Sequence, residues 1–301
     1  MSSIFVQIPA YHDYELPRTI RDAINKSSGN HTINFGVHLT YYKNNDIDMS
    51  GLSNVKIDYS LAPNNLGQGM SRYLANEFYD EEDYYLQIDS HTRFEQDWDE
   101  WFIDSYKFYK DLGLNPVLSC YPGAYEYVEN ELFILNEKSQ VFYTDFIQEL
   151  SFPENDYIPH QRAVANPDNN IFTRSVSGGS IFSEGAIGLI KPNIHMYFHA
   201  EEILTALRLY THGYDLLLPK RQNLYHLYYD ASKKEKNQRR QTGEDFPKEV
   251  NNLDKKSKFE LSQIIKNKII GPDALGSVRT LEEYEQFAGI DFALKKVSPV
   301  V

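Results

Sequence analysis

Apolar and polar positions follow two different periods along the first part of the chain. Short runs rich in β-branched and aromatic residues predict buried strands at 4–8, 33–39, 55–59 and 84–88. Between them, apolar positions recur at helical spacing over 17–24 and 67–79. Pro17 suits the first turn of the earlier helix, because its missing N–H would have no partner there. This alternation predicts an α/β fold, with a mostly parallel sheet and helices on its faces.

The pattern is less regular beyond residue 90. We expect helices over 98–109, 201–212 and 259–270, and strands over 116–121, 175–182, 216–218 and 223–229. Residues 122–174 are aromatic and polar and show no clear period, so we interpret them as an insertion. The chain is therefore predicted to form one α/β domain over 1–230 that carries this insertion. Residues 231–301 are predicted to form an appendage whose C-terminal helix packs on the domain.

Composition narrows the class of protein. The 301-residue chain is 41% hydrophobic and 24% charged, as in an ordinary globular protein, but its 23 Tyr and 17 Phe are unusual. We expect most of these rings in the core and some on surfaces that stack on sugars or bases. A net charge of −13 argues against a large nucleic-acid footprint, because that requires a basic surface to displace counterions.

Cysteine usage and the first residues bear on location. Cys120 is the single cysteine, so no intrachain disulfide can form and a reducing compartment is expected. Residues 1–10 look like a strand rather than a signal peptide, and no apolar run approaches the ~20 residues of a membrane span. The sequence therefore predicts a cytoplasmic protein without a membrane segment.

The triplet Asp89-Ser90-His91 is the strongest candidate for chemistry. It directly follows the strand predicted at 84–88, and open parallel sheets bind ligands at the carboxyl ends of their strands. In extended backbone, side chains two residues apart point to the same side, so Asp89 and His91 can reach one divalent cation. A carboxylate with an imidazole suits Mn²⁺, with Mg²⁺ as the alternative. Such a triplet also arises by chance or as a helix cap.

His226 is the best candidate for a third ligand. It lies in the extended run Leu224-Tyr225-His226-Leu227-Tyr228, near the end of the predicted domain. The competing interpretation is an ordinary half-buried histidine. His195, His199 and His212 are weaker candidates, and His212 suits the end of a helix, where the dipole favours a cation.

Two other segments have features of a nucleotide site. After the first strand, Tyr11 could stack on a base and Asp13 could accept a hydrogen bond from it, although an ordinary loop with a cap fits equally well. In 67–72, two glycines let the backbone approach a ligand, and Arg72 could pair with a phosphate or carboxylate.

Charged residues mark two further places. Glu201 and Glu202 open a helix, where the dipole favours acids in any case; alternatively, one of them contacts a sugar or an attacking hydroxyl. Residues 232–248 are poor in apolar residues and rich in Lys and Arg. They predict either a solvated loop or a lid over a phosphate-bearing ligand.

Taken in order, these segments resemble a known family. The similar segments are 4–8 with Tyr11 and Asp13, 16–20, 72–75, 84–91, Glu201-Glu202, 213–216 and 225–228. They are similar to the cytoplasmic N-acetylglucosaminyltransferases that modify hydroxyproline on a protein and, more distantly, to the polypeptide N-acetylgalactosaminyltransferases. The likeness covers about residues 3 to 230 and is most characteristic over 86–93; residues 275–292 resemble the tail of such proteins.

The resemblance implies a GT-A fold and metal-dependent transfer of GlcNAc, or a related hexose, from a UDP-sugar with retention of configuration. It implies that Asp89, His91 and His226 hold the metal, with Asp89-Ser90-His91 at the centre of the nucleotide-sugar site. It also implies nucleotide contacts from Tyr11, Asp13 and Arg72, a sugar-facing strand at Gly178 and Gly179, and an acid at Glu201 or Glu202 that contacts the sugar.

The resemblance does not extend to the acceptor. Residues 122–174 match no pattern of the family, and acceptor choice usually lies in such segments, so we expect only a hydroxyl group on a protein or glycan. A hydroxylated nucleobase is the alternative acceptor, disfavoured by the net charge of −13. A non-catalytic carbohydrate-binding module is disfavoured by the intact triplet and His226. An inverting relative would need a carboxylate base near the acceptor, a role that Glu202 could fill.

Overall fold

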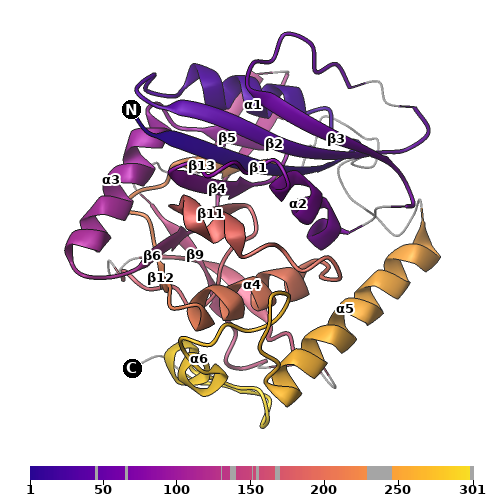
Figure 1. Ribbon diagram of the computed structural model, residues 1–301, viewed down its shortest axis with the longest axis vertical. Helices are drawn as coiled ribbons and strands as arrows, with labels where there is room; N and C mark the ends of the chain where they lie inside the picture. The colour runs from indigo at the N-terminus through magenta and orange to yellow at the C-terminus, as the bar shows by residue number, and fades with distance from the viewer. Residues whose placement is uncertain are drawn as a thin grey trace.

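A central seven-stranded sheet organises the molecule (Figure 1). The computed structural model describes residues 1–44, 47–64, 67–129, 131–135, 140–150, 152–153, 156–166, 170–228 and 246–298. In spatial order the strands are β12 (Asp215–Leu217), β6 (Pro116–Ser119), β11 (Ser180–Glu184), β4 (Tyr84–Ile88), β1 (Ser3–Tyr11), β2 (Thr32–Tyr41) and β3 (Val55–Leu61). Strand β11 runs antiparallel to both neighbours, and the four other pairings are parallel. The predicted mostly parallel α/β sheet is confirmed.

Helices cover both faces of this sheet, because β1 is apolar on both sides. Successive side chains of a strand point to opposite faces. Ile4 and Val6 join one buried cluster, whereas Phe5 joins the other. The first cluster includes α1 (Leu16–Asn25) and α3 (Trp98–Asp111). The second includes α4 (His199–Thr211), α5 (Pro247–Asn267), α6 (Leu281–Ala288) and the 3₁₀ turn η1 (Gly185–Leu189).

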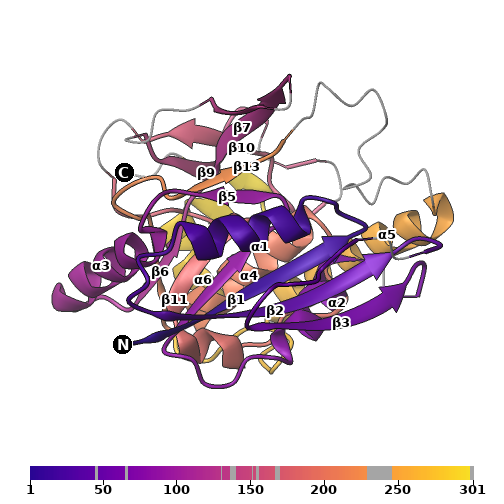
Figure 2. The same cartoon turned by 90° about the horizontal axis from the view of Figure 1, so that it is seen from above.

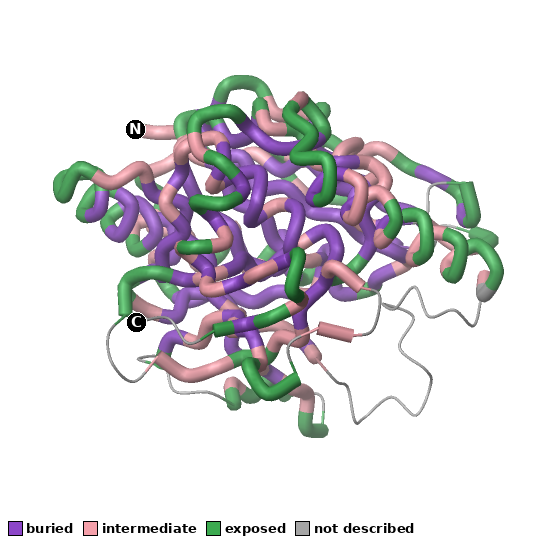
Figure 3. The backbone as a smooth tube through the Cα atoms, turned by 90° about the horizontal axis from the view of Figure 1, so that it is seen from below, coloured by how far each residue is buried: buried purple, intermediate pink, exposed green. Residues whose placement is uncertain are grey.

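One further helix packs very closely on the sheet. A Cβ atom added at Gly36 of β2 would lie 2.5 Å from the carbonyl oxygen of Ala75 in α2 (Gln68–Asn76) and 2.4 Å from the Phe5 ring. Only glycine allows this approach, which places α2 on the Phe5 side of the sheet. The buried interior and exposed rim that result are visible in Figure 3.

Three smaller sheets complete the fold. One has the order β5 (Thr92–Phe94), β13 (Leu224–His226), β7 (Gly123–Val128) and β8 (Glu131–Ile134). The others are the pair β9 (Phe142–Phe146) with β10 (Gln161–Ala165), and the pair β14 (Ile290–Asp291) with β15 (Lys296–Val297). Figure 2 shows β7, β9, β10 and β13 gathered on one side of the main sheet.

The segment 122–174 is more integrated than the sequence indicated. Its first strand, β7, pairs in parallel with β13, so it belongs to the sheet that carries His226. Its strands are only four to six residues long, and two of them, β8 and β10, have no buried position, so no period stands out in the sequence. The division of the chain at residues 122–174 and 230 stays a prediction.

Several element boundaries differ from those expected. Strand β4 spans the predicted residues, whereas Gly178 and Gly179 lie in a turn just before β11 rather than within a strand. Helix α5 begins at Pro247, well before the predicted start at residue 259. Most of the lid candidate at 232–248 falls in 229–245, outside the described residues. None of the helices in the described part of the chain is long and apolar enough to cross a membrane.

Candidate active site

The site lies where the direction of chain progression in the main sheet reverses. From β1 the chain continues to β2 on one side, while β4 lies on the other. Ligands of open α/β sheets bind at such a switch point, beyond the carboxyl ends of the strands. Asp89 follows the last residue of β4, and the loop after β1 lies beside it, so this edge is where the candidate residues meet.

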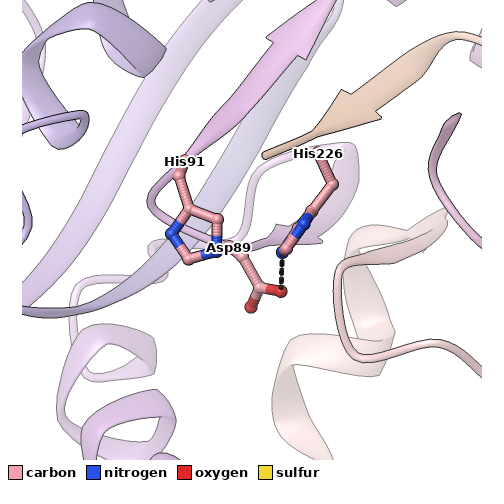
Figure 4. Close-up of side chains that lie close together, drawn as sticks. All are labelled: Asp89, His91 and His226. Atoms are coloured by element: carbon pink, nitrogen blue, oxygen red, sulfur yellow. Dashed lines mark ion pairs between the residues drawn. The ribbon is translucent and has the colours of Figure 1, made fainter. Parts of the chain in front are cut away.

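Asp89, His91 and His226 come together at this edge (Figure 4). One potential ligand atom from each lies within 4.8 Å of the other two. His226 Nε2 is 3.3 Å from Asp89 Oδ2. The approach depends on the pairing of β5 with β13, which sets His226 opposite Thr92, the residue after His91. The tertiary structure thus brings His226 next to Asp89 and His91, which lie far from it in the sequence.

Asp13 lies behind His91. Its carboxylate is 1% exposed and does not line the cavity; Oδ2 is 2.7 Å from His91 Nδ1 and accepts a 2.6 Å hydrogen bond from Ser90 Oγ. Burial raises the pKa of Asp13, but the charge and hydrogen bond of His91 outweigh it, so the pKa lies below its ordinary value. An ionised Asp13 therefore orients His91, with Ser90 in the same contact, and its expected contact with a nucleotide stays a prediction.

The donor set fits a divalent cation. With Nδ1–H of His91 directed at Asp13, Nε2 carries the lone pair that a metal requires, an arrangement common among metal-binding histidines. One carboxylate and two imidazoles suit Mn²⁺ and leave coordination positions for oxygen ligands. Asp89, His91 and His226 are therefore the residues that would hold the metal.

Arg72 pairs with carboxylates, one of the two kinds of partner expected for it, and its contact with a nucleotide stays a prediction. It is 1% exposed, and Nη2 donates to Asp89 Oδ1 at 3.0 Å and to the Gly178 carbonyl at 2.8 Å. Its Nε is 3.4 Å from Glu201 Oε1. Burial raises the pKa of Asp89, but the hydrogen bond from His226 and the charge of Arg72 hold it well below its usual range. Arg72 thus fixes the two acids on either side of it.

Two acids from the first turn of α4 face the same space. Glu202 accepts hydrogen bonds from the Gly178 N–H at 2.9 Å and from Gln161 Nε2 at 3.1 Å. Glu201 is buried, and its burial, together with the nearby Glu202 and Asp89 charges, raises its pKa to about 7 against the lowering effect of Arg72. Glu202 is therefore anchored at the cavity wall, while Glu201 lies deeper beside Arg72.

The turn before β11 has glycine for steric reasons. A Cβ at Gly179 would lie 3.1 Å from Asp89 Oδ2, and one at Gly178 would lie 3.2 Å from both Arg72 Nη2 and Glu201 Oε2. Larger residues would displace the Asp89 carboxylate or the ion pair behind it. The two glycines therefore let the backbone pass close to the candidate metal ligands.

A cavity of about 240 Å³ opens in front of these residues. Besides Asp89, His226, Arg72, both glycines and both glutamates, it is lined by Gln68, Tyr121, Pro122, Thr144, Gln161, Arg162, Ala163, Ser177, Phe198, His199 and Tyr228. Tyr121 and Tyr228 stack in parallel with ring centroids 5.3 Å apart. Among these additional residues, Tyr228 had a sequence signal because it lies two residues after His226, and His199 was a weaker candidate ligand; the β9–β10 residues had no signal.

Tyr11, His195 and His212 lie apart from this cavity, whereas His199 is part of its lining. Tyr11 is 8% exposed and packs with Ala62 against α5. His195 and His212 do not line the cavity, and His212 caps the C-terminus of α4. His199 reaches the rim, where Nδ1 is 2.9 Å from Gln161 Nε2.

Solved structures of other proteins are similar to this chain in fold. The GalNAc-T7 structure with UDP, GalNAc and Mn²⁺ is similar to this chain at a TM-score of 0.54 and 11% identity, over 96% of this chain and 55% of that one. The chain thus spans about half the length of GalNAc-T7. A structure of S. aureus TarS 1–349 in complex with UDP-GlcNAc has a TM-score of 0.49 and 14% identity, over 98% of this chain and 72% of that one.

No curated protein matches the sequence. The pattern of a family described as Glycosyltransferase (GlcNAc), in contrast, matches residues 52–294, which is most of the chain and includes all three candidate metal ligands. The sheet of mixed direction with helices on both faces is the GT-A fold. The chain therefore belongs to the Glycosyltransferase (GlcNAc) family and has the GT-A fold.

Proposed function

We propose that the protein transfers GlcNAc, or a related hexose, from a UDP-sugar to a hydroxyl group on a protein or glycan, with a divalent cation and with retention of configuration. The observation that carries the proposal is the convergence of Asp89, His91 and His226 at the ligand-binding edge of the sheet. Family membership supports the sugar, and the GalNAc-T7 structure, which contains UDP and Mn²⁺, supports the nucleotide and the metal.

The bound cation would neutralise the diphosphate and stabilise it as the leaving group. Residues of the protein hold the metal ligands in position for that step. Asp13 keeps the His91 proton on Nδ1, so Nε2 stays available. Arg72 directs one oxygen of Asp89 away from the metal position and leaves Oδ2 on the side of His226. These contacts fix the ligands before substrate arrives, which lowers the cost of reorganisation.

On the sugar side, Glu201 and Glu202 are the acids available to bind hydroxyl groups. Glu202 holds the Gly178 turn through its N–H and is braced by Gln161. In a front-face attack, the acceptor hydroxyl approaches from the side of the departing diphosphate and passes its proton to it. No separate strong base is required, so both acids serve to position the sugar.

The decisive experiment measures release of UDP from a panel of UDP-sugars with and without Mn²⁺. We expect metal-dependent release that is fastest with UDP-GlcNAc or a close relative, and at least a hundredfold loss in Asp89→Ala, because a ligand and the partner of Arg72 disappear together. NMR of the transferred sugar should show retained anomeric configuration. Calorimetry supplies a second measure: UDP binding that ignores Mn²⁺ and survives Asp89→Ala unchanged would contradict the metal site.

A further inference from the structure

Helix α5 is divided into two halves with different neighbours. In its second half, Leu261, Ile264 and Ile265 are buried in the large apolar cluster shared with α4 and α6. At the midpoint, the buried Ser257 accepts a hydrogen bond from the Tyr197 N–H at 2.9 Å. The second half is thus fixed to the body of the protein. The first half, with the residue before it (246–256), extends beyond that anchor.

This leading half (246–256) runs past the carboxyl edge of the main sheet (Figures 1 and 2). Phe246 and Leu253 pack on a buried pair, Tyr11 at the end of β1 and Ala62 just after β3. The Phe246 ring also meets Tyr42, just after β2, edge-on at 5.4 Å. The same helix face therefore reaches the ends of three adjacent parallel strands, the edge at which sheets of this kind bind ligands.

Leu253 also touches the loop that enters the cavity. A Cβ at Gly67 would lie 3.8 Å from Leu253 Cδ1, and the next residue, Gln68, lines the cavity with Arg72. Gly67 has a φ of 107°, a conformation that only glycine adopts easily. The leading half of α5 thus packs on the turn that leads into the cavity-lining residues Gln68 and Arg72.

We propose that the leading half of α5 forms the outer wall of the nucleoside end of the donor site, with Leu253 and Phe246 as its contact residues. The inference rests on the proposed function. With the diphosphate at Asp89 and the sugar side bounded by Glu202 and Gln161, the nucleoside extends toward Tyr11 and Gly67. An apolar helix face beside a tyrosine ring suits the flat base of a nucleotide. The C-terminal region therefore contributes to donor binding.

The test is the affinity of Leu253→Ala for UDP in the presence of Mn²⁺, measured by calorimetry, with the KM for the turned-over UDP-sugar as a second readout. Truncation removes apolar contact with the nucleoside, so we expect Kd and KM to rise about tenfold while kcat changes less than twofold. Leu253→Met keeps the contact and should restore wild-type values.

Two control variants on α5 separate this effect from loss of stability. Phe259→Ala alters a ring that is 66% exposed on the same helix and should leave both Kd and stability unchanged. Leu261→Ala should lower the melting temperature without raising the Kd of the folded protein, because Leu261 belongs to the anchored half. Unchanged or tighter UDP binding in Leu253→Ala overturns the inference alone; absence of UDP binding in the wild type overturns it together with the proposed function.

Discussion

Replacing Asp13 by Asn tests whether a buried carboxylate prepares His91 for metal binding. The wild-type carboxylate faces His91 Nδ1 at 2.7 Å and Ser90 Oγ at 2.6 Å, both short and charge-assisted hydrogen bonds. Asparagine has nearly the same shape but offers one acceptor oxygen and one donor nitrogen. If the amide nitrogen faces His91, the imidazole proton moves to Nε2 and occupies the position that the metal requires.

The size of the effect follows from this single contact. Loss of the carboxylate partner of a metal-binding histidine typically costs ~10–100-fold in metal affinity. That corresponds to ~1.4–2.7 kcal/mol at 25 °C. Because Asp13 is 1% exposed, solvent cannot replace the lost acceptor, and we expect the upper part of this range.

The assay is titration of Mn²⁺ in the presence of UDP, with free Mn²⁺ measured by electron paramagnetic resonance. Asp99→Asn is the matched control: Asp99 is fully buried and accepts hydrogen bonds from the Ser28 N–H and hydroxyl at 2.9 and 2.7 Å, without contact with the metal ligands. Both variants should lose stability, but only Asp13→Asn should lose Mn²⁺ affinity. Wild-type Mn²⁺ affinity in a folded Asp13→Asn would refute the reasoning.

Three further predictions concern other parts of the fold. Burial lowers the pKa of His38 to about 4 in the folded state, below its ordinary 6.5, so the unfolded state binds more protons between these values. The free energy of unfolding should therefore fall by about 3 kcal/mol as pH drops from 6.5 to 4, and chemical denaturation of His38→Gln should lack this decline. Gly179→Ala should slow UDP release about tenfold by displacing the Asp89 carboxylate, whereas Gly271→Ala, whose added Cβ meets no atom within 4 Å, should not; equal rates would contradict the steric argument. Glu202→Gln should slow transfer by tenfold or less, and a loss above about a hundredfold would indicate a general base and contradict front-face attack.

Local pattern was enough to predict the framework of the fold. The run 84–88 is rich in Tyr and Leu and directly precedes Asp89, so both the strand and the position of Asp89 at its carboxyl end could be predicted from the sequence. The acids in the first turn of α4 and the glycine that follows His212 at its end could also be predicted from the neighbouring sequence. These features depend on residues within one or two turns of each other, and such short-range preferences are written in the sequence itself.

The roles of the polar residues required the tertiary structure. Asp13 and Arg72 were expected to contact the nucleotide, and the structure shows that both also hold protein partners: Asp13 contacts His91, and Arg72 contacts Asp89 and Gly178. No spacing predicts this, because each contact joins separate segments whose distance depends on how strands and helices pack.

For the same reason, the residues that form the walls of the cavity could not be predicted from the sequence. Gln161 of β10 reaches Glu202 of α4, and Leu253 of α5 reaches the Gly67 loop, across gaps in sequence that carry no periodic signal. The sequence by itself predicted most of the main-sheet strands, the helices of the first part of the chain and the family, and it indicated Asp89, His91 and His226 as candidate metal ligands. Only the tertiary structure decided which polar side chains line the cavity and which are buried behind it in hydrogen bonds to other residues. The reason is that burial and pairing depend on contacts between distant segments.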